Sequence, residues 1–155
     1  VAVDENRRIR PETRFRVGLV FQYPEHQLFE TDIFKDVCFG PKNLGLSRQE
    51  YELRAFESLR LVGLDENLYY QSPFDLSGGQ KRRVAIAGVL AMKPDVLILD
   101  EPTRNFSPLS GPVIRKMLRE FPGAVISISH DRKYIEEVCD KIYQLNPNGL
   151  QLISE

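Results

Sequence analysis

Short apolar runs alternate along the chain with amphipathic stretches, which is the pattern of strands separated by helices. Residues 16–22, 96–99 and 124–129 each form an apolar run that predicts a buried strand. The run at 96–99 is apolar throughout, as expected of a central parallel strand that is covered on both faces. Because strands that alternate with helices favour parallel pairing, the sequence predicts an α/β fold with a mainly parallel sheet and flanking helices.

Helical patterns fill the stretches between these runs. A helix at 33–40 is expected to break at Gly40-Pro41, because proline lacks the amide that continues a helix. Ser47 and Glu50 have capping-box spacing and Gly63 suits a left-handed stop, so a second helix is predicted between them. The remaining expected elements are helices at 84–92, 112–120 and 132–140, and a hairpin of 142–145 with 150–153 around Asn148-Gly149.

Composition is that of one soluble globular domain. The chain has 155 residues, of which 42% are apolar and 28% are charged, and this is enough to fill a core. Lys plus Arg number 21 and Asp plus Glu 22, which argues against a protein that binds nucleic acid mainly by neutralising phosphates. No apolar run approaches the roughly 20 residues that span a bilayer. The two cysteines lack CxxC spacing, so we expect a reducing cytosol rather than a disulfide framework or structural zinc.

The most distinctive motif is the run Leu76-Ser-Gly-Gly-Gln80, which directly precedes the helix predicted at 84–92. Ser77 and Gln80 have the spacing of a capping box, and the two glycines between them leave the backbone uncovered. The free N–H groups and partial positive charge of a helix N-terminus attract anions, so a phosphate can bind here with the Ser77 hydroxyl as a further donor. A plain capped helix after a turn explains the same residues, because capping boxes are common.

Polar residues follow the predicted strands, at the carboxyl ends where chemistry gathers in open parallel sheets. Asp100 is well placed to hold Mg²⁺ directly or through water, and the amide of Gln22 can reach the same ion or its water. Glu101 can orient or deprotonate an attacking water, and His130 can donate a hydrogen bond to a phosphate oxygen. Taken singly, each residue has a plainer explanation: a polar loop or, for His130, a position beside a helix cap at Asp131.

The order and spacing of these motifs resemble the ATP-binding cassette (ABC) ATPases, and the resemblance covers nearly the whole chain. It implies a partial P-loop NTPase of the ABC type, in which a partial nucleotide-binding domain spans residues 1–155. Within it the resemblance implies a helical signature region at about 33–92 and a Walker B and switch-histidine region at 93–155. The matches are Gln22 with the Q-loop glutamine, Leu76–Gln80 with the family signature, 96–100 with the Walker B strand, Glu101 with the catalytic glutamate and His130 with the switch histidine.

The resemblance also implies the function of an ATP-binding and ATP-hydrolysing subunit that powers a membrane importer, with ATP and Mg²⁺ as its cofactors. In the family, two cassettes enclose ATP between them, so a second ABC ATPase subunit is an expected partner and nucleic acid is not. The implied site residues are Ser77, Gly78, Gly79, Gln80 and Gln22 for the nucleotide, Asp100 and Gln22 for Mg²⁺, and Glu101 and His130 for catalysis.

A narrower likeness is to the ATPase subunits of energy-coupling-factor importers, including the cobalt type. It rests on residues 17–25, 27–29 and 39–46. That group takes up vitamins or transition-metal ions, and its ATPases are cytoplasmic and peripheral on the inner face of the cell membrane. The resemblance implies that about Tyr23 to Gly45 contacts a transmembrane transporter subunit, although core packing explains the aromatic residues of this segment equally well.

Two features depart from the family pattern. No G-x-x-x-x-G-K-[ST] occurs in the chain, and in the family this phosphate-binding loop precedes the Q-loop, so we expect it upstream of Val1 in a larger protein. The segment 104–112 lacks the aspartate that the family usually carries in its D-loop. Because the loop's amides and lysine hold the β- and γ-phosphates, we expect the chain alone to bind ATP weakly and to be inactive.

These departures leave other functions open. A non-catalytic ABC fragment, or an interaction module that supplies only the signature half of a composite ATP site, fits the missing phosphate-binding loop. A soluble cassette protein of repair or translation is a third possibility. The balanced charge and the segment at 23–46 count against that third possibility.

Overall fold

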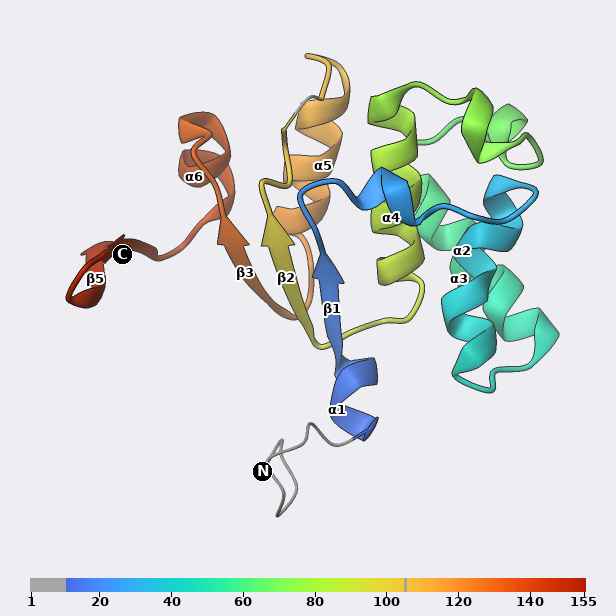
Figure 1. The fold of residues 1–155 in the computed structure, drawn as a ribbon, viewed down its shortest axis with the longest axis horizontal. Coiled ribbons are helices and arrows are strands. Elements are labelled where there is room, and N and C mark those ends of the chain that lie inside the picture. Colours follow the sequence, from blue (N-terminus) through green and yellow to red (C-terminus); the bar gives the residue numbers. More distant parts are fainter. Residues whose placement is uncertain (1–10, 105) are drawn as a thin grey trace.

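The apolar runs form the strands of one parallel sheet in the computed structural model, which describes residues 11–104 and 106–155 (Figure 1). The sheet has the order β1-β2-β3, with each strand parallel to its neighbour, so the predicted α/β class and parallel pairing are confirmed. Since parallel strands end at the same edge, the residues that follow them are brought together there. The strand bounds are Val17–Val20 for β1, Val96–Asp100 for β2 and Ala124–Ile128 for β3.

The helices and a separate hairpin account for the remaining regular structure of the described residues. The hairpin is the predicted one, and Gly149 at its turn has a φ of +116° that favours glycine. No described helix is long and apolar enough to cross a membrane. The element bounds are Pro11–Arg16 for α1, Ile33–Asn43 for α2, Arg48–Leu61 for α3, Gly78–Leu90 for α4, Ser110–Arg119 for α5, Arg132–Val138 for α6, Ile142–Asn146 for β4 and Gly149–Ser154 for β5, with short 3-10 turns at Pro24–Gln27, Glu66–Leu68 and Pro73–Asp75.

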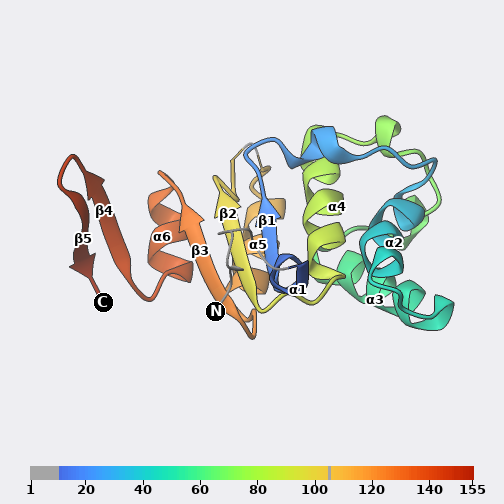
Figure 2. The same cartoon turned by 60° about the horizontal axis from the view of Figure 1, so that its bottom comes forward.

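Helix α4 lies between the sheet and the helices α2 and α3 (Figure 1). Figure 2 shows α4 between β1 and the pair α2 and α3, and Figure 1 shows the same order from another direction. The core joins buried residues of the sheet, such as Val20 and Leu99, to apolar residues of α4 and α5, such as Ile86 and Ile114. Because α4 runs opposite in direction to the strands, its N-terminus lies on the side of the fold toward which they point (Figure 1).

One face of the sheet is buried, and the other is largely open within the described residues. Leu97 and Leu99 are fully buried, whereas Val96 and Ile98, which alternate with them, are half-buried. The prediction that 96–99 is covered on both faces is therefore wrong for this part of the chain. Strand β3, whose sequence predicts a buried strand, has no fully buried residue either. The reason is that side chains alternate across a strand, so helices on one face cannot cover apolar residues on the other.

Two helix boundaries also differ from those expected. Helix α2 continues through Gly40-Pro41 to Asn43, so the predicted break is wrong. A Cβ at Gly40 would lie 2.9 Å from Met92 Cγ, which shows that glycine serves a close approach here. Pro41 lies in the last turn, where one missing amide leaves the earlier turns intact. Helix α4 already begins at Gly78, because the Ser77 cap starts it ahead of the predicted 84–92. The division into regions 33–92 and 93–155 stays a prediction.

Candidate functional site

The residues predicted from the strand ends gather at one edge of the sheet. Gln22 lies just beyond β1, Asp100 is the last residue of β2, and His130 lies just beyond β3. The Glu101 amide donates a hydrogen bond of 2.8 Å to the Ile128 carbonyl, which extends the pairing of β2 with β3 by one step. Within the described residues no hydrogen bond joins Gln22 to Asp100 or Glu101, so Gln22 shares the edge with the two acids without being bonded to them.

Glu101 and His130 form the closest approach between candidate catalytic side chains. Glu101 Oε1 lies 3.8 Å from His130 Nε2. The Glu101 side chain is only 15% exposed, whereas that of His130 is 94% exposed. The half-enclosed carboxylate can act as a base toward a water that attacks a phosphate, and the exposed imidazole can donate a hydrogen bond to an oxygen of the same phosphate.

The backbone of Glu101 adopts a left-handed conformation, with φ of +49°. A side chain in this region costs about 1–2 kcal/mol, because Cβ approaches the following carbonyl. Such strain persists only when neighbouring groups hold it, and it clusters at functional sites. Besides the bond to Ile128, the Glu101 carbonyl accepts the Arg104 amide at 3.1 Å and Arg82 Nη2 at 2.6 Å. Both the amide and the carbonyl of Glu101 are therefore held by hydrogen bonds.

Arg82 of α4 is the functional candidate that the sequence analysis missed. Its side chain is 2% exposed, and its guanidinium donates to the carbonyls of Glu101 and Arg104. Burial lowers the pKa of Arg82 from its usual value, and the carboxylates of Glu25, Asp100 and Glu101 oppose that shift. Because the usual pKa of an arginine guanidinium lies so far above neutral pH, Arg82 stays charged in this position.

The signal for Arg82 was present in the helical pattern. In an α-helix, residues three and four positions apart share a face. Ala85 and Ile86 stand at those distances from Arg82, and both are buried. A charged residue on a face that is otherwise small and apolar indicates a buried cation with specific partners.

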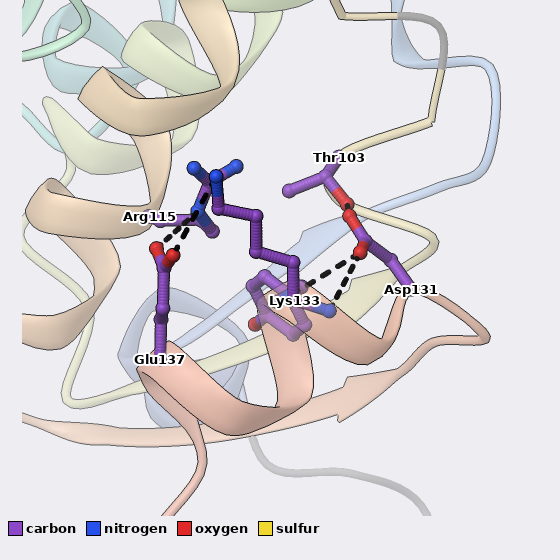
Figure 3. Close-up of polar contacts among 6 residues, drawn as sticks. Thr103, Arg115, Asp131, Lys133 and Glu137 are labelled. Atoms are coloured by element: carbon purple, nitrogen blue, oxygen red, sulfur yellow. Dashed lines mark hydrogen bonds and ion pairs between the residues drawn. The ribbon is translucent and has the colours of Figure 1, made fainter. Parts of the chain in front are cut away.

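The loops after Glu101 and His130 are joined through Asp131, as Figure 3 shows. One Asp131 oxygen caps α6 by accepting the amides of Lys133 at 3.0 Å and Tyr134 at 3.2 Å, so the predicted cap is confirmed. The other oxygen accepts the Thr103 hydroxyl at 2.8 Å. This hydroxyl is the main reason why the pKa of Asp131 lies below its usual value. His130 and Glu101 are therefore flanked by one connected pair of turns.

A second connection stabilises α6 against α5. Arg115 is buried, and its Nε donates to a carboxylate oxygen of Glu137 (Figure 3). Because α6 begins next to His130, this pair helps to hold the end of the loop that carries the histidine. A buried guanidinium paired with a carboxylate is expensive to break, since the remaining charge is left without a partner.

The Ser77–Gln80 motif forms the capping box that its spacing predicts. The Gln80 amide donates to Ser77 Oγ at 3.3 Å, and the Ser77 amide donates to Gln80 Oε1 at 2.9 Å. Ser77 itself is exposed. The amides of Gly78 and Gly79 have no acceptor within the described residues, so they remain available to an anion at this helix N-terminus.

Both glycines face open space. A Cβ on Gly78 would meet nothing within 4 Å, and one on Gly79 would meet only Phe106 Cδ1 at 3.9 Å. The packing of the described residues thus does not require glycine here. An open hollow of about 590 Å³ lies at this point, with Ser77, Gly79 and Gln80 on one side and Ser107 and Ser110 on the other.

The capping motif and the strand edge are two separate groups in this chain. No hydrogen bond or ion pair within the described residues joins Ser77–Gln80 to Asp100, Glu101 or His130. The segment 104–112, which lacks a D-loop aspartate, runs beside the hollow, but residue 105 lies outside the described part. The capping motif offers free backbone amides that can bind a phosphate, whereas the strand edge offers a carboxylate and an imidazole that can take part in its hydrolysis.

The segment from Tyr23 to Gly45 presents aromatic side chains to solvent. Tyr23, Phe29 and Phe39 are exposed, whereas Phe34 is half-buried and packs against the core. An assignment of Phe34 to an exposed partner-binding surface is therefore wrong, and core packing, the alternative explanation for these aromatic residues, holds for it. The ring of Phe39 meets Phe29 edge-on at 4.8 Å between centroids, so the two form one small apolar surface.

Comparison with known proteins connects this geometry to one family. The family model for "ABC transporter" matches residues 2–104. The energy-coupling factor transporter ATP-binding protein EcfA2 of Caldanaerobacter subterraneus is 49% identical over 146 residues, which are 92% of this chain and 51% of that protein. EcfA2 of Clostridium acetobutylicum is 50% identical over 137 residues, 85% of this chain and 48% of that protein.

Solved structures give the same result. The structure of cbiO1 from Clostridium perfringens, described as part of the ABC transporter complex cbiONQ, is similar with a TM-score of 0.73 and 40% identity. That match covers 84% of this chain and 53% of cbiO1. The dimeric ABC transporter cassette MJ0796 is similar with a TM-score of 0.74 and 29% identity, over 83% of this chain and 57% of that one. The chain spans about half the length of the curated relatives that it matches.

Proposed function

Because the chain belongs to the ABC transporter family, we propose that it forms part of an ATP-hydrolysing subunit of an importer of the energy-coupling-factor type. Such a subunit couples ATP hydrolysis to the uptake of a vitamin or a metal ion. Support comes from the 49% identity to an energy-coupling factor ATP-binding protein and from the similarity to cbiO1. Since the chain spans about half the length of these relatives, the activity of a whole subunit belongs to this proposal.

The observation that carries the proposal is the approach of Glu101 to His130 at the edge where β1, β2 and β3 end. Glu101 accepts the proton of an attacking water, and His130 donates a hydrogen bond to a phosphate oxygen as its charge increases. A positioned general base contributes roughly 10²- to 10⁴-fold to a rate. The low exposure of Glu101 supports its role, because a carboxylate held away from bulk water keeps one orientation toward the reacting atoms.

Asp100 and Gln22 fit the requirements of a Mg²⁺ site. Both offer oxygen ligands at the same edge, and both are half-buried. The described residues hold no cluster of His, Cys, Asp and Glu large enough for an all-protein metal cage. This matches the preference of Mg²⁺ for one or two protein oxygens completed by water and phosphate. When bound there, the ion would neutralise charge on the phosphates.

The capping motif serves the ATP of a second subunit in this proposal. Ser77, Gly78, Gly79 and Gln80 bind that nucleotide through the free glycine amides and the serine hydroxyl, at the exposed N-terminus of α4. The separation of this motif from the strand edge supports a site shared between two subunits. MJ0796, described as a dimeric cassette, is a structural relative in which two cassettes associate.

The remaining partner is a transmembrane transporter subunit. The surface from Tyr23 to Gly45, with exposed Tyr23, Phe29 and Phe39, is the part of the chain that we assign to it. This assignment places the protein in the cytoplasm, peripheral on the inner face of the membrane. The cbiO1 relative is described as part of a transporter complex, which supports an assembly of this kind.

The proposal is tested by Glu101→Gln in the assembled ATPase that contains this chain. We expect ATP binding and closure of the dimer to persist, because the amide keeps the shape of the side chain, while turnover stops for lack of a base. Binding is measured by nucleotide trapping and turnover by phosphate release. Glu120→Gln, at an exposed glutamate after α5, is the control for loss of a negative charge. Near-normal phosphate release from Glu101→Gln would remove Glu101 from this role.

A non-catalytic module that supplies only the capping motif is the second candidate function. The observation that favours it is an intact Ser77–Gln80 cap that shares no hydrogen bond or ion pair with Asp100, Glu101 or His130 within the described residues. For either function we expect the 155-residue chain alone to show no tight ATP binding. Titration with a fluorescent ATP analogue measures this directly, and saturable tight binding would contradict the expectation.

A further inference from the structure

Arg82 of α4 makes two hydrogen bonds to the turn after β2, and the proposed reaction assigns no role to them. Its guanidinium spans two carbonyls of one turn, with Nη2 at 2.6 Å from the Glu101 oxygen and Nη1 at 3.1 Å from the Arg104 oxygen. The guanidinium carbon lies 5.8 Å from the centroid of the Phe106 ring, and Nε has no partner within the described residues. The side chain is thus committed to the turn that follows β2.

The turn depends on such partners. Glu101 is in the left-handed region with φ of +49°, which a glutamate does not prefer. A buried guanidinium without a matching carboxylate in direct contact is itself unfavourable, and here its charge is compensated by the two backbone carbonyls that it binds. The groups that it holds are the carbonyls on either side of the residues 102–103.

General packing of α4 does not explain this contact. Arg83, the next residue of the same helix, donates to the carbonyls of Val62 at 3.4 Å and Gly63 and therefore already connects α4 to the end of α3. Arg82 points to a different neighbour, the turn that carries Glu101. The chain thus contains two adjacent arginines that both bind backbone carbonyls, of which Arg82 contacts the turn that carries Glu101 and Arg83 contacts the end of α3.

We propose that Arg82 is a positioning residue for Glu101. By holding the Glu101 carbonyl, it maintains the left-handed backbone and sets the carboxylate beside His130. It also joins this turn to α4, two residues beyond the Ser77–Gln80 cap, so a displacement of that helix changes the position of the carboxylate. The catalytic consequence rests on the proposed function, whereas the hold on the Glu101 carbonyl is a property of the chain alone.

The first test uses amide hydrogen exchange in the 155-residue chain. Arg82→Lys keeps the charge, but a single ammonium cannot span both carbonyls. We expect exchange at the Arg104 amide, which donates to the Glu101 carbonyl, to rise about tenfold or more above any change at the core amides of β2. Arg83→Lys is the matched control, since it removes carbonyl contacts from the same helix at Val62 and Gly63. Equal exchange at Arg104 in the two variants would overturn the proposal.

A measurement on the unmodified chain covers the case in which Arg82→Lys does not fold. A scalar coupling across the hydrogen bond, from an Arg82 Nη nitrogen to the Glu101 carbonyl carbon, is expected in the nuclear magnetic resonance spectrum, together with slow rotation of the guanidinium. A freely rotating Arg82 guanidinium would refute the contact.

The second test uses the assembled ATPase. Because a misplacement of about 1 Å can cost 10²-fold, we expect Arg82→Lys to lower kcat by roughly 10- to 10²-fold at a nearly unchanged KM for ATP. A merely destabilised protein would instead lose active molecules in proportion to its unfolded fraction, which is measured in parallel. A wild-type kcat in Arg82→Lys would overturn the positioning role. If the unmodified assembly hydrolyses no ATP, the proposed function fails, while the exchange test still decides how Glu101 is held.

Discussion

Removal of the Thr103 hydroxyl is expected to loosen the connection between the Glu101 turn and the His130 loop. Thr103→Val keeps the shape of the side chain and removes the donor of the 2.8 Å bond to Asp131. A hydrogen bond to a charged group contributes about 1.5–3 kcal/mol, and the solvent access of Asp131 brings the expected loss nearer 1 kcal/mol. The carboxylate keeps its two amide donors at the start of α6, so the cap itself survives.

The pH dependence of this loss follows from the direction of the Asp131 shift. The Thr103 hydroxyl lowers the pKa of Asp131 in the folded state, whereas the unfolded chain has the ordinary value of about 3.9. The stability that arises from the charged carboxylate is therefore present above that value and is lost as the pH falls through the lower folded pKa. The difference between Thr103→Val and the unmodified chain should shrink below about pH 4.

Urea unfolding of both chains, at neutral and acidic pH, measures these differences. Thr31→Val is the matched control, because the Thr31 hydroxyl makes solvent-exposed contacts, to Asp32 at 3.5 Å and from Lys35 Nζ at 3.1 Å, so a change within about 0.5 kcal/mol is expected. Asp131→Asn completes a double-mutant cycle, since asparagine still caps a helix but carries no charge. Additive effects of Thr103→Val and Asp131→Asn, within about 0.3 kcal/mol, would refute the coupling.

Two further predictions concern packing and thiol reactivity. Gly18→Ala should destabilise the fold by about 1–3 kcal/mol, because a Cβ there would lie 2.5 Å from Val89 Cγ1 and 2.9 Å from Leu97 Cδ2. Gly88→Ala, where no atom lies within 4 Å, should instead stabilise α4 by about 0.5–1 kcal/mol, and equal signs in urea unfolding would contradict this reasoning. Burial raises the pKa of Cys38 to about 11, so in a Cys139→Ser background its reaction with Ellman's reagent at pH 8 should follow local opening; immediate reaction of Cys38 in that folded chain would disprove it.

Local signals accounted for much of the fold and of the candidate site. Helix caps, such as those at Ser77 and Asp131, depend on contacts within a few residues, and both form as their spacing predicts. The strand ends were also accessible, because an apolar run that stops at a carboxylate, as at Asp100, marks its own boundary. Parallel pairing then places Asp100 and His130 at one edge with no further information.

The features that escaped prediction depend on residues far apart in the sequence. The close approach of Gly40 to Met92, which is more than fifty positions away along the chain, cannot be read from the local pattern around Gly40-Pro41. The left-handed Glu101 is held from α4 by Arg82; the helical pattern indicates a buried cation at Arg82, but it does not identify the Glu101 carbonyl, 19 positions away, as the partner. The open face of β2 escaped for a similar reason, since an apolar run does not tell which of its sides the chain covers.

The left-handed backbone of Glu101 has a consequence for how this position tolerates change. Glycine adopts that conformation freely, so Glu101→Gly should raise the melting temperature even though it deletes the carboxylate. Variants selected for expression alone would then drift toward glycine at position 101, while selection for nucleotide turnover would keep the acid. If one library favoured glycine at position 101 and the other favoured glutamate, the glutamate would be kept for its chemistry although it lowers the stability of the fold.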